Sequence, residues 1–243
     1  MTTTATAVET RRIGRVRLGD IDPDLVASGG PDGDGRAASV AVLEVAAGAR
    51  VLGVESIATS ARGGLVLRGL LLRDVQAGGG AISELIGPGD VIAAAADDAD
   101  GFPMRVTWRA LERTLIADLA TVDPKDPSTQ LTVAENIAGR LHDQARRASA
   151  RCAITAVIRV DLRLLAYLWQ TAVRFGTVTP AGVRLDLPLT HAVLAQLIGA
   201  RRPTVTTAFR TLTNPLPSLL RQQTIRMEVP PSSFVMLIFR HWF

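Results

Sequence analysis

A long helical repeat in the middle of the chain constrains its fold more than any other feature. Apolar and small residues keep a 3-4-3-4 spacing over about three and a half heptads: Leu131, Ala134, Ala138, Leu141, Ala145, Ala148, Cys152 and Thr155. The pattern predicts a dimerisation helix over residues 128–158, capped by Ser128. Its solvated face is expected to carry Arg140, Asp143, Arg146, Arg147 and Arg151. A single amphipathic helix lying on the chain's own sheet is the alternative.

Short apolar runs broken by glycine precede this helix and predict a β domain over residues 37–122. The runs span 40–45, 50–54, 64–72, 90–94 and 106–110, lengths typical of a small sandwich or barrel. The stretch 41–49 is also compatible with a helix, because Ala and Glu favour helices. Residues 111–120 predict a strand followed by a helix. The segment 1–36, which is Gly-rich near its end, predicts a flexible N-terminus.

Helical patterns return after the long helix and predict a second domain over residues 159–230. Residues 161–175 predict a helix that Gly176 ends. Its apolar side would hold Leu164, Leu165, Leu168, Trp169 and Val173, with Tyr167 also in the core. Residues 177–185 predict a short hairpin.

The segment 189–212 predicts two short helices around a tight turn. Thr190 can cap the first helix, Gly199 allows the turn, and Pro203 is tolerated in the first turn of the second helix. Val205, Phe209 and Leu212 are expected to face inward. This arrangement is typical of the helix-turn-helix, whose second helix enters the major groove of DNA. An ordinary helical hairpin with a solvated Arg face is the alternative.

Charge and residue type favour DNA as the partner of this segment. Residues 1–129 carry 13 basic and 18 acidic side chains, whereas residues 130–243 carry 14 basic and 5 acidic ones. An excess of +9 in the second part suggests contact with a polyanion. The predicted DNA contacts are Arg201, Arg202, Thr204, Thr206, Thr207 and Arg210. Arg202 and Thr206 are assigned to base edges, and Arg201 and Arg210 to phosphates.

The segment 189–212 resembles the helix-turn-helix of the Crp/Fnr superfamily of bacterial transcription regulators. The resemblance rests on Leu-Thr at 189–190, Leu-Ala-Gln-Leu-Ile-Gly at 194–199 and Arg-Arg-Pro-Thr-Val at 201–205. It extends more weakly to 159–169 and to the turn Gly87-Pro-Gly-Asp90. The resemblance implies an α+β fold with a cyclic-nucleotide-binding-like β-roll, a dimerisation helix and a C-terminal winged helix-turn-helix. It also implies a homodimer on double-stranded DNA, RNA polymerase as a partner, and a small-molecule effector in the β-roll.

Two departures from the family pattern limit what carries over. Pro203 and Thr207 stand where many members have Glu and Arg, so the familiar operator sequence is not expected. Gly89-Asp90 is the nearest equivalent of the Gly-Glu pair that holds a cyclic nucleotide's ribose. The region after it has no Arg for the phosphate and instead carries Asp97, Asp98 and Asp100, which disfavours cyclic-nucleotide binding.

The end of the chain leaves alternatives open. Residues 219–221 and 224–229 are compatible with a wing, although Pro215 and Pro217 end the preceding helix early. The apolar tail 231–243 is compatible with a strand on the wing, a dimer contact or a non-native reading of the coding sequence. It is too short to cross a membrane.

Other chemistry finds little support in the sequence. His142, His191 and His241 have no metal-ligand partners at useful spacing, and Cys152 is alone. No phosphate-binding loop or nucleophile elbow is present. We therefore expect neither an enzyme nor a cofactor, and a cytoplasmic protein without membrane contact. The alternative function is a ligand-binding or scaffold β-roll with a degenerate helical tail that does not bind DNA.

Overall fold

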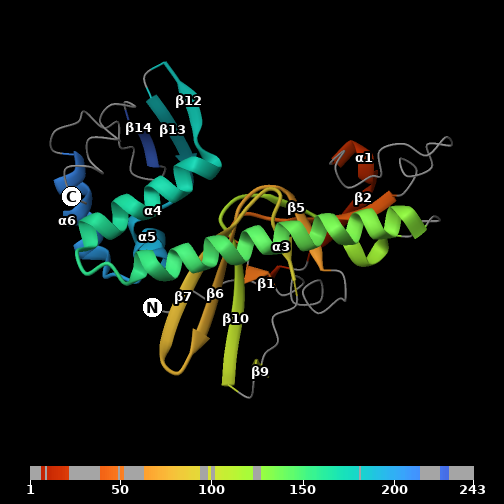
Figure 1. The fold of residues 1–243 in the computed structure, drawn as a ribbon, viewed down its shortest axis with the longest axis horizontal. Coiled ribbons are helices and arrows are strands. Elements are labelled where there is room, and N and C mark those ends of the chain that lie inside the picture. The colour runs from red at the N-terminus through yellow and green to blue at the C-terminus, as the bar shows by residue number, and fades with distance from the viewer. Residues whose placement is uncertain are drawn as a thin grey trace. The chain divides into compact units, whose positions relative to one another are not determined.

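The computed structural model describes residues 7–8, 10–21, 39–48, 50–51, 63–93, 98–99, 102–122, 127–180, 182–213 and 225–229. The chain divides into two compact units, residues 1–147 and 148–243. The helix α3 (Pro127–Thr155) belongs to both (Figure 1). A β-rich N-terminal region, helices and a C-terminal helix-turn-helix confirm the predicted α+β fold.

Two sheets build the first unit. One sheet has the order β1-β4-β10-β6-β7, with β9 paired to β10, and the other has the order β2-β3-β11-β5-β8. The strands are β1 (Ala7–Val8), β2 (Arg11–Arg17), β3 (Ser39–Val45), β4 (Arg50–Val51), β5 (Gly64–Arg68), β6 (Leu71–Ala77), β7 (Gly80–Ile86), β8 (Val91–Ile92), β9 (Asp98–Ala99), β10 (Phe102–Ala110) and β11 (Thr114–Asp118). The strand predicted within residues 111–120 is present as β11, and the element that follows it is a 3-10 turn, η3 (Leu119–Thr121).

The core of the β-roll lies between the two sheets. It combines Leu43, Val66 and Ile116 of the second sheet with Leu71 and Trp108 of the first. Successive residues of β3 point to opposite apolar layers, because Leu43 belongs to this core and Val40 to a second cluster outside it. The helix considered for residues 41–49 is therefore wrong, and the predicted strand at 40–45 is confirmed.

The prediction of a flexible segment through residue 36 is wrong for residues 11–21. Strand β2 pairs antiparallel with β3 and is followed by the short helix α1 (Leu18–Ile21). Leu18 is fully buried in the outer cluster, which fixes this segment to the β-roll. The strand escaped prediction because its seven residues are all exposed, so they lack the alternation that marks a half-buried strand. The rest of 1–36, apart from residues 7, 8 and 10, lies outside the described residues.

Helix α3 packs one face on the β-roll and leaves another open. Val133 is buried in the outer cluster, with Ile137 packed beside it. The heptad residues lie on a different face, where Leu131 is 61% exposed and Leu141 is 37% exposed. The helix begins at Pro127, a residue suited to a first helical position. Ser128 therefore lies within the helix, and its prediction as N-cap is wrong.

The second unit packs three helices with a small sheet. Its elements are α4 (Val160–Phe175), β12 (Thr177–Thr179), β13 (Gly182–Leu187), α5 (His191–Leu197), α6 (Arg202–Thr213) and β14 (Ile225–Val229). The three strands form an antiparallel sheet of order β12-β13-β14. Strand β14 falls within the stretch 224–229 considered for the wing, whereas 219–221 and the tail 231–243 lie outside the described residues.

Helix α4 shows which of its predicted core residues are buried. Leu164, Leu165, Leu168 and Tyr167 are buried, as expected. Trp169 and Val173 are exposed, so their prediction as core residues is wrong; Thr171 takes the buried position instead. Gly176 does end the helix, with an extended backbone. A Cβ there would lie 2.3 Å from the Ala172 carbonyl oxygen, so close approach explains this glycine. No helix in the described part of the chain has the length and apolar character to span a membrane.

Candidate nucleic-acid interface

Local sequence signals set the two helices of the candidate site. The Thr190 hydroxyl accepts a hydrogen bond from the Val193 amide at 3.2 Å and so caps α5. Gly199 has φ of +61°, a conformation that side chains with a Cβ rarely adopt. Val205 and Phe209 of α6 are buried, as are Leu194 and Ile198 before the turn. The predicted pair of helices around Gly199 is confirmed.

Arg163 of α4 holds the turn between these helices. Its Nη1 donates to the carbonyl oxygens of Ile198 and Gly199 at 3.1 and 3.2 Å. Its Nε and Nη2 donate to the Val157 carbonyl at 2.8 and 2.6 Å. The guanidinium thereby satisfies carbonyls at the end of α5 that have no partner inside the helix. The role of Arg163 could not be recognised from the sequence, because its partners in the turn lie 35 and 36 positions away.

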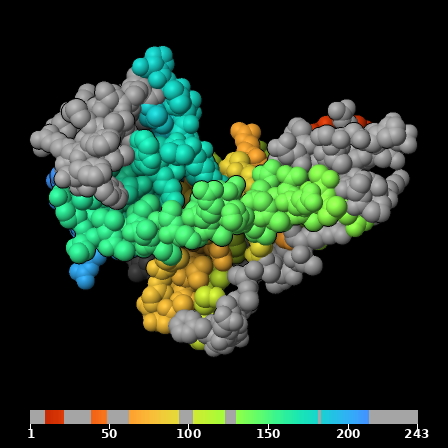
Figure 2. Space-filling model, viewed as in Figure 1, coloured from red at the N-terminus to blue at the C-terminus, as the bar shows by residue number. Residues whose placement is uncertain are grey.

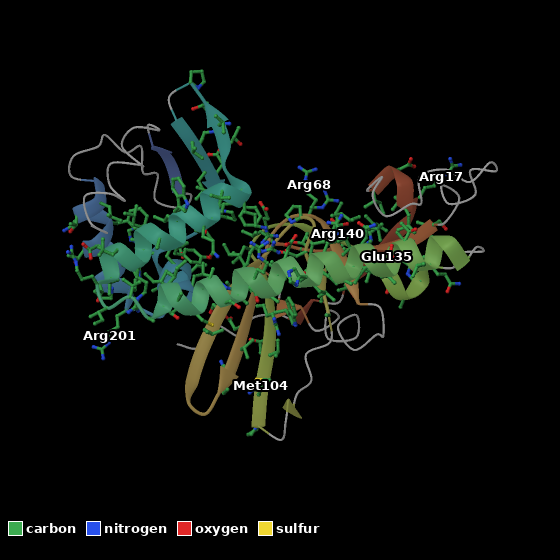
Figure 3. The ribbon with its side chains drawn as sticks, in the orientation of Figure 1. Arg17, Arg68, Met104, Glu135, Arg140 and Arg201 are labelled. Atoms are coloured by element: carbon green, nitrogen blue, oxygen red, sulfur yellow. The ribbon has the colours of Figure 1, made fainter. Side chains whose placement is uncertain are left out.

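Five of the six predicted contact residues lie on α6, and Arg201 directly precedes it. Arg201, Arg202, Thr204, Thr207 and Arg210 are exposed, and Thr206 is half-buried. Figure 3 shows the Arg201 side chain projecting away from the ribbon. No ion pair holds Arg201 or Arg202 among the described residues. The sequence has no acidic residue between Asp186 and Glu228, so nothing acidic in that stretch offsets the arginines.

Three threonine hydroxyls on α6 bond to their own helix. Thr206 donates to the Arg202 carbonyl at 3.1 Å, and Thr207 donates to the Pro203 carbonyl at 3.2 Å. Thr211 donates to the Thr207 carbonyl at 3.2 Å. Thr204 has no such bond within the part of the chain that the structure describes. The hydroxyl protons of the first three are thus engaged, whereas that of Thr204 is available.

His191 connects α5 to α6. Its Nδ1 lies 3.1 Å from the Thr206 Oγ1, and its ring stacks on Phe209 with centroids 5.2 Å apart. Since the Thr206 hydroxyl donates to the Arg202 carbonyl, its oxygen can accept a hydrogen bond from the tautomer of His191 that carries a proton on Nδ1. Burial, and secondarily the positive charge of Arg202, lower the pKa of His191. Thr206 is therefore held in place, and its assignment to base edges stays a prediction, as do the other contact roles.

A polar cluster joins α3 to the turn 87–91 of the β-roll. Arg140 donates to the Gly89 carbonyl at 3.1 Å, and the Gln144 side chain bonds both the amide and the carbonyl of Val91, at 2.9 and 3.1 Å. Arg147 pairs with Asp90 at 2.7 Å. The prediction that Arg140 and Arg147 face solvent is wrong, because both lie on the side of α3 that meets this turn.

The Asp90 side chain is bound by other groups of the protein. Its carboxylate is buried and accepts from the Gly87 amide at 2.8 Å as well as from Arg147. The Gly89-Asp90 pair therefore does not offer a free carboxylate to a ribose. The side chains of Asp97, Asp98 and Asp100 lie outside the described residues.

The β-roll has an open cavity of about 600 Å³. Apolar side chains of β2, β3, β5 and β11 line most of it, among them Ile13, Val16, Val42 and Leu115. Arg15 and Asp20 supply its charged groups. Three Arg15 hydrogen bonds, to Ser39 and Thr121, fix that side chain.

The helix-turn-helix and the fold are both similar to those of known proteins. Residues 162–214 match the family model of the Crp-like helix-turn-helix domain. No curated protein sequence matches the chain. A CRP/FNR-family transcriptional regulator from Thermus thermophilus is 22% identical, with 81% of this chain and 97% of that chain covered and a TM-score of 0.56.

Two further solved structures share the fold. A CooA mutant from Carboxydothermus hydrogenoformans is 18% identical, covering 80% of this chain and 86% of that chain with a TM-score of 0.56. The c-di-GMP-responsive global regulator CLP from Xanthomonas campestris is 16% identical, covering 77% and 93% with a TM-score of 0.51. The helix-turn-helix predicted for residues 189–212 therefore lies within a Crp-like helix-turn-helix domain, and the chain has the fold of CRP/FNR-family regulators.

Proposed function

We propose that this protein is a sequence-specific DNA-binding transcription regulator that acts as a homodimer. The observation that carries the proposal is the open side of α6, where three exposed arginines lie on a Crp-like helix-turn-helix without acidic neighbours in sequence. Arg202 would read a base edge, and Arg201 and Arg210 would bind phosphates. Thr204, in the first turn of α6, has a hydroxyl without a hydrogen bond to any described residue and suits a phosphate contact. Pairing of β14 with β13 supports a wing beside them.

The open face of α3 supports the homodimer. Of the eight heptad residues, six are exposed, namely Leu131, Ala134, Ala138, Leu141, Ala145 and Cys152. In Figure 2, α3 is the green segment, with its side chains at the surface. Small side chains along the heptad face would let a second α3 approach closely. Two copies would then place their recognition helices in successive major grooves, about 34 Å apart.

The cavity in the β-roll supports a small-molecule effector of apolar character. Its volume of about 600 Å³ suits a ligand of drug-like size. Apolar lining and an internally bonded Asp90 favour such a ligand over a cyclic nucleotide. RNA polymerase as a further partner rests on the family resemblance alone.

Fluorescence anisotropy with purified full-length protein tests the DNA-binding proposal. We expect tighter binding to DNA from the region upstream of its own gene than to random DNA, with an affinity that falls steeply as salt rises. Arg202→Ala should weaken binding by about tenfold to a hundredfold at its preferred sequence. Arg146→Ala, which removes an exposed arginine of α3, is the matched control and should bind like the wild type.

Absence of any salt-dependent binding would contradict the proposal. It would favour the alternative of a ligand-binding or scaffold protein whose helical region does not engage DNA.

A further inference from the structure

We propose that α6 recognises thymine through its methyl group, with the γ-methyl of Thr207 as the principal contact and Pro203 beside it. The inference rests on the proposed DNA-binding function and names the base chemistry that this surface would read. The major groove displays the C5-methyl of thymine, which apolar groups, including the threonine methyl, can contact.

The hydrogen bonds within α6 point to methyl contact. The Thr207 hydroxyl donates to the Pro203 carbonyl one turn earlier, so its proton is already engaged. With the oxygen turned back against the helix, the γ-methyl is the group of this exposed side chain left to face outward. A base that required the hydroxyl as a donor would have to break the bond to Pro203.

The neighbours of Thr207 extend this apolar contact. Pro203 is exposed one turn before it and has neither an amide proton nor a polar side chain. Thr211 is exposed one turn after it, and its hydroxyl is likewise bonded to the helix, at the Thr207 carbonyl. Residues 203, 207 and 211 therefore form one ridge along α6, since positions four apart lie on the same face.

Two arginines lie in the row of α6 beside this ridge. Arg202 and Arg210 are exposed and eight positions apart, so they share one row, on the same side of the ridge. An arginine fork matches the O6 and N7 acceptors of guanine. The surface thus fits a half-site in which a thymine methyl lies close to a guanine.

Deoxyuridine substitution tests this inference directly, because deoxyuridine lacks only the methyl of thymine. The full-length protein is first used to select duplexes from a random-sequence library. Each thymine of the preferred duplex is then replaced by deoxyuridine, and the affinity is measured by anisotropy. We expect one thymine in each half-site whose replacement weakens binding by about threefold to fivefold, the value of one buried methyl.

Two substitutions of Thr207 separate methyl contact from hydroxyl contact. Thr207→Val keeps a methyl at this position and removes the hydroxyl, so the sensitivity to deoxyuridine should persist. Thr207→Ser keeps the hydroxyl and removes the methyl, so the sensitivity at that thymine should disappear. Thr204→Ser is the matched control, since its position is assigned to a phosphate, and it should leave the deoxyuridine sensitivity unchanged.

The possible outcomes distinguish this inference from the function on which it rests. If the library yields no preferred sequence, the proposed function fails and the inference with it. If a preferred sequence emerges but no thymine replacement weakens binding, only the inference is overturned. Loss of sensitivity in Thr207→Val would also overturn it, because the hydroxyl would then be the reading group.

Discussion

At the scale of single residues, His191 shows how the candidate site sets the protonation of a side chain. Burial against α6 and the charge of Arg202 lower the pKa of its ring. We expect an NMR titration of the ring to show a pKa below the usual 6.5. Arg202→Gln should raise that pKa only part of the way, since burial is the larger cause. A pKa at or above 6.5 in the folded wild type would contradict the geometry.

The lowered pKa also fixes the direction in which stability changes with pH. The folded protein binds a proton at His191 only below the pKa of the unfolded chain. As pH falls through about 6.5, the unfolded chain therefore takes up protons that the folded chain does not, and folding is weakened. Above that pH, His191 is neutral in both states, and its full contribution to the free energy of unfolding is present. His191→Gln should remove this part of the decline in Tm between about pH 8 and about pH 5, whereas His142→Gln, an exposed control on α3, should not.

At the scale of elements, α3 shows how far periodicity can predict structure. The heptad spacing predicted a long dimerisation helix. The long helix is present, because a period of seven keeps one side of a helix aligned, whereas the dimer contact stays a prediction. The stripe Arg140, Gln144 and Arg147 was assigned to solvent or left unassigned, although it meets the turn 87–91. The partners of these side chains lie more than 50 positions away in sequence. From the sequence alone, polar residues that bind such distant partners cannot be told from polar residues that face solvent.

Elements of the β-roll and of the candidate site were predictable where their signals are local in sequence, and not where they depend on distant contacts. Strand β2 has no apolar alternation, and only its pairing with β3 reveals it. Thr190, Gly199 and the inward Val205 and Phe209 were predictable because their signals are local. Arg163 was not, because it acts on a turn that another helix brings to it.

The ion pair between Asp90 and Arg147 is expected to stabilise the contact of α3 with the turn 87–91. Arg147→Ala removes the cation that pairs with the buried Asp90 carboxylate, so we expect a loss of about 1–3 kcal/mol in the free energy of unfolding. Asp90→Asn combined with Arg147→Ala should cost less than the sum of the two single changes, because the unpaired charge is gone. Urea unfolding measures each term. Arg146→Ala, whose exposed partner Asp143 lies 3.8 Å away, should change stability by less than about 0.5 kcal/mol. Strict additivity would mean that the ion pair contributes nothing.

At the scale of the whole molecule, we expect DNA affinity through α6 to depend on dimerisation through α3. A single copy of α6 offers one short recognition surface, whereas two copies held by α3 would bind two half-sites at once. The gain in affinity then depends on the heptad face, whose residues are not among the predicted DNA contacts. Disruption of that face should therefore weaken DNA binding without altering the reading residues.

A pair of alanine substitutions on α3 tests this dependence. Ala145 and Ala150 are both exposed, but they lie roughly 140° apart around the helix, and only Ala145 belongs to the heptad face. Ala145→Arg should place like charges against each other across the seam and shift the protein toward monomer, seen by analytical ultracentrifugation. Its affinity for a two-site operator should fall at least about tenfold, while its affinity for a single half-site stays unchanged. Ala150→Arg adds the same side chain off the seam and should remain dimeric. Equal behaviour of the two variants would show that the copies, if they associate, do so through another surface.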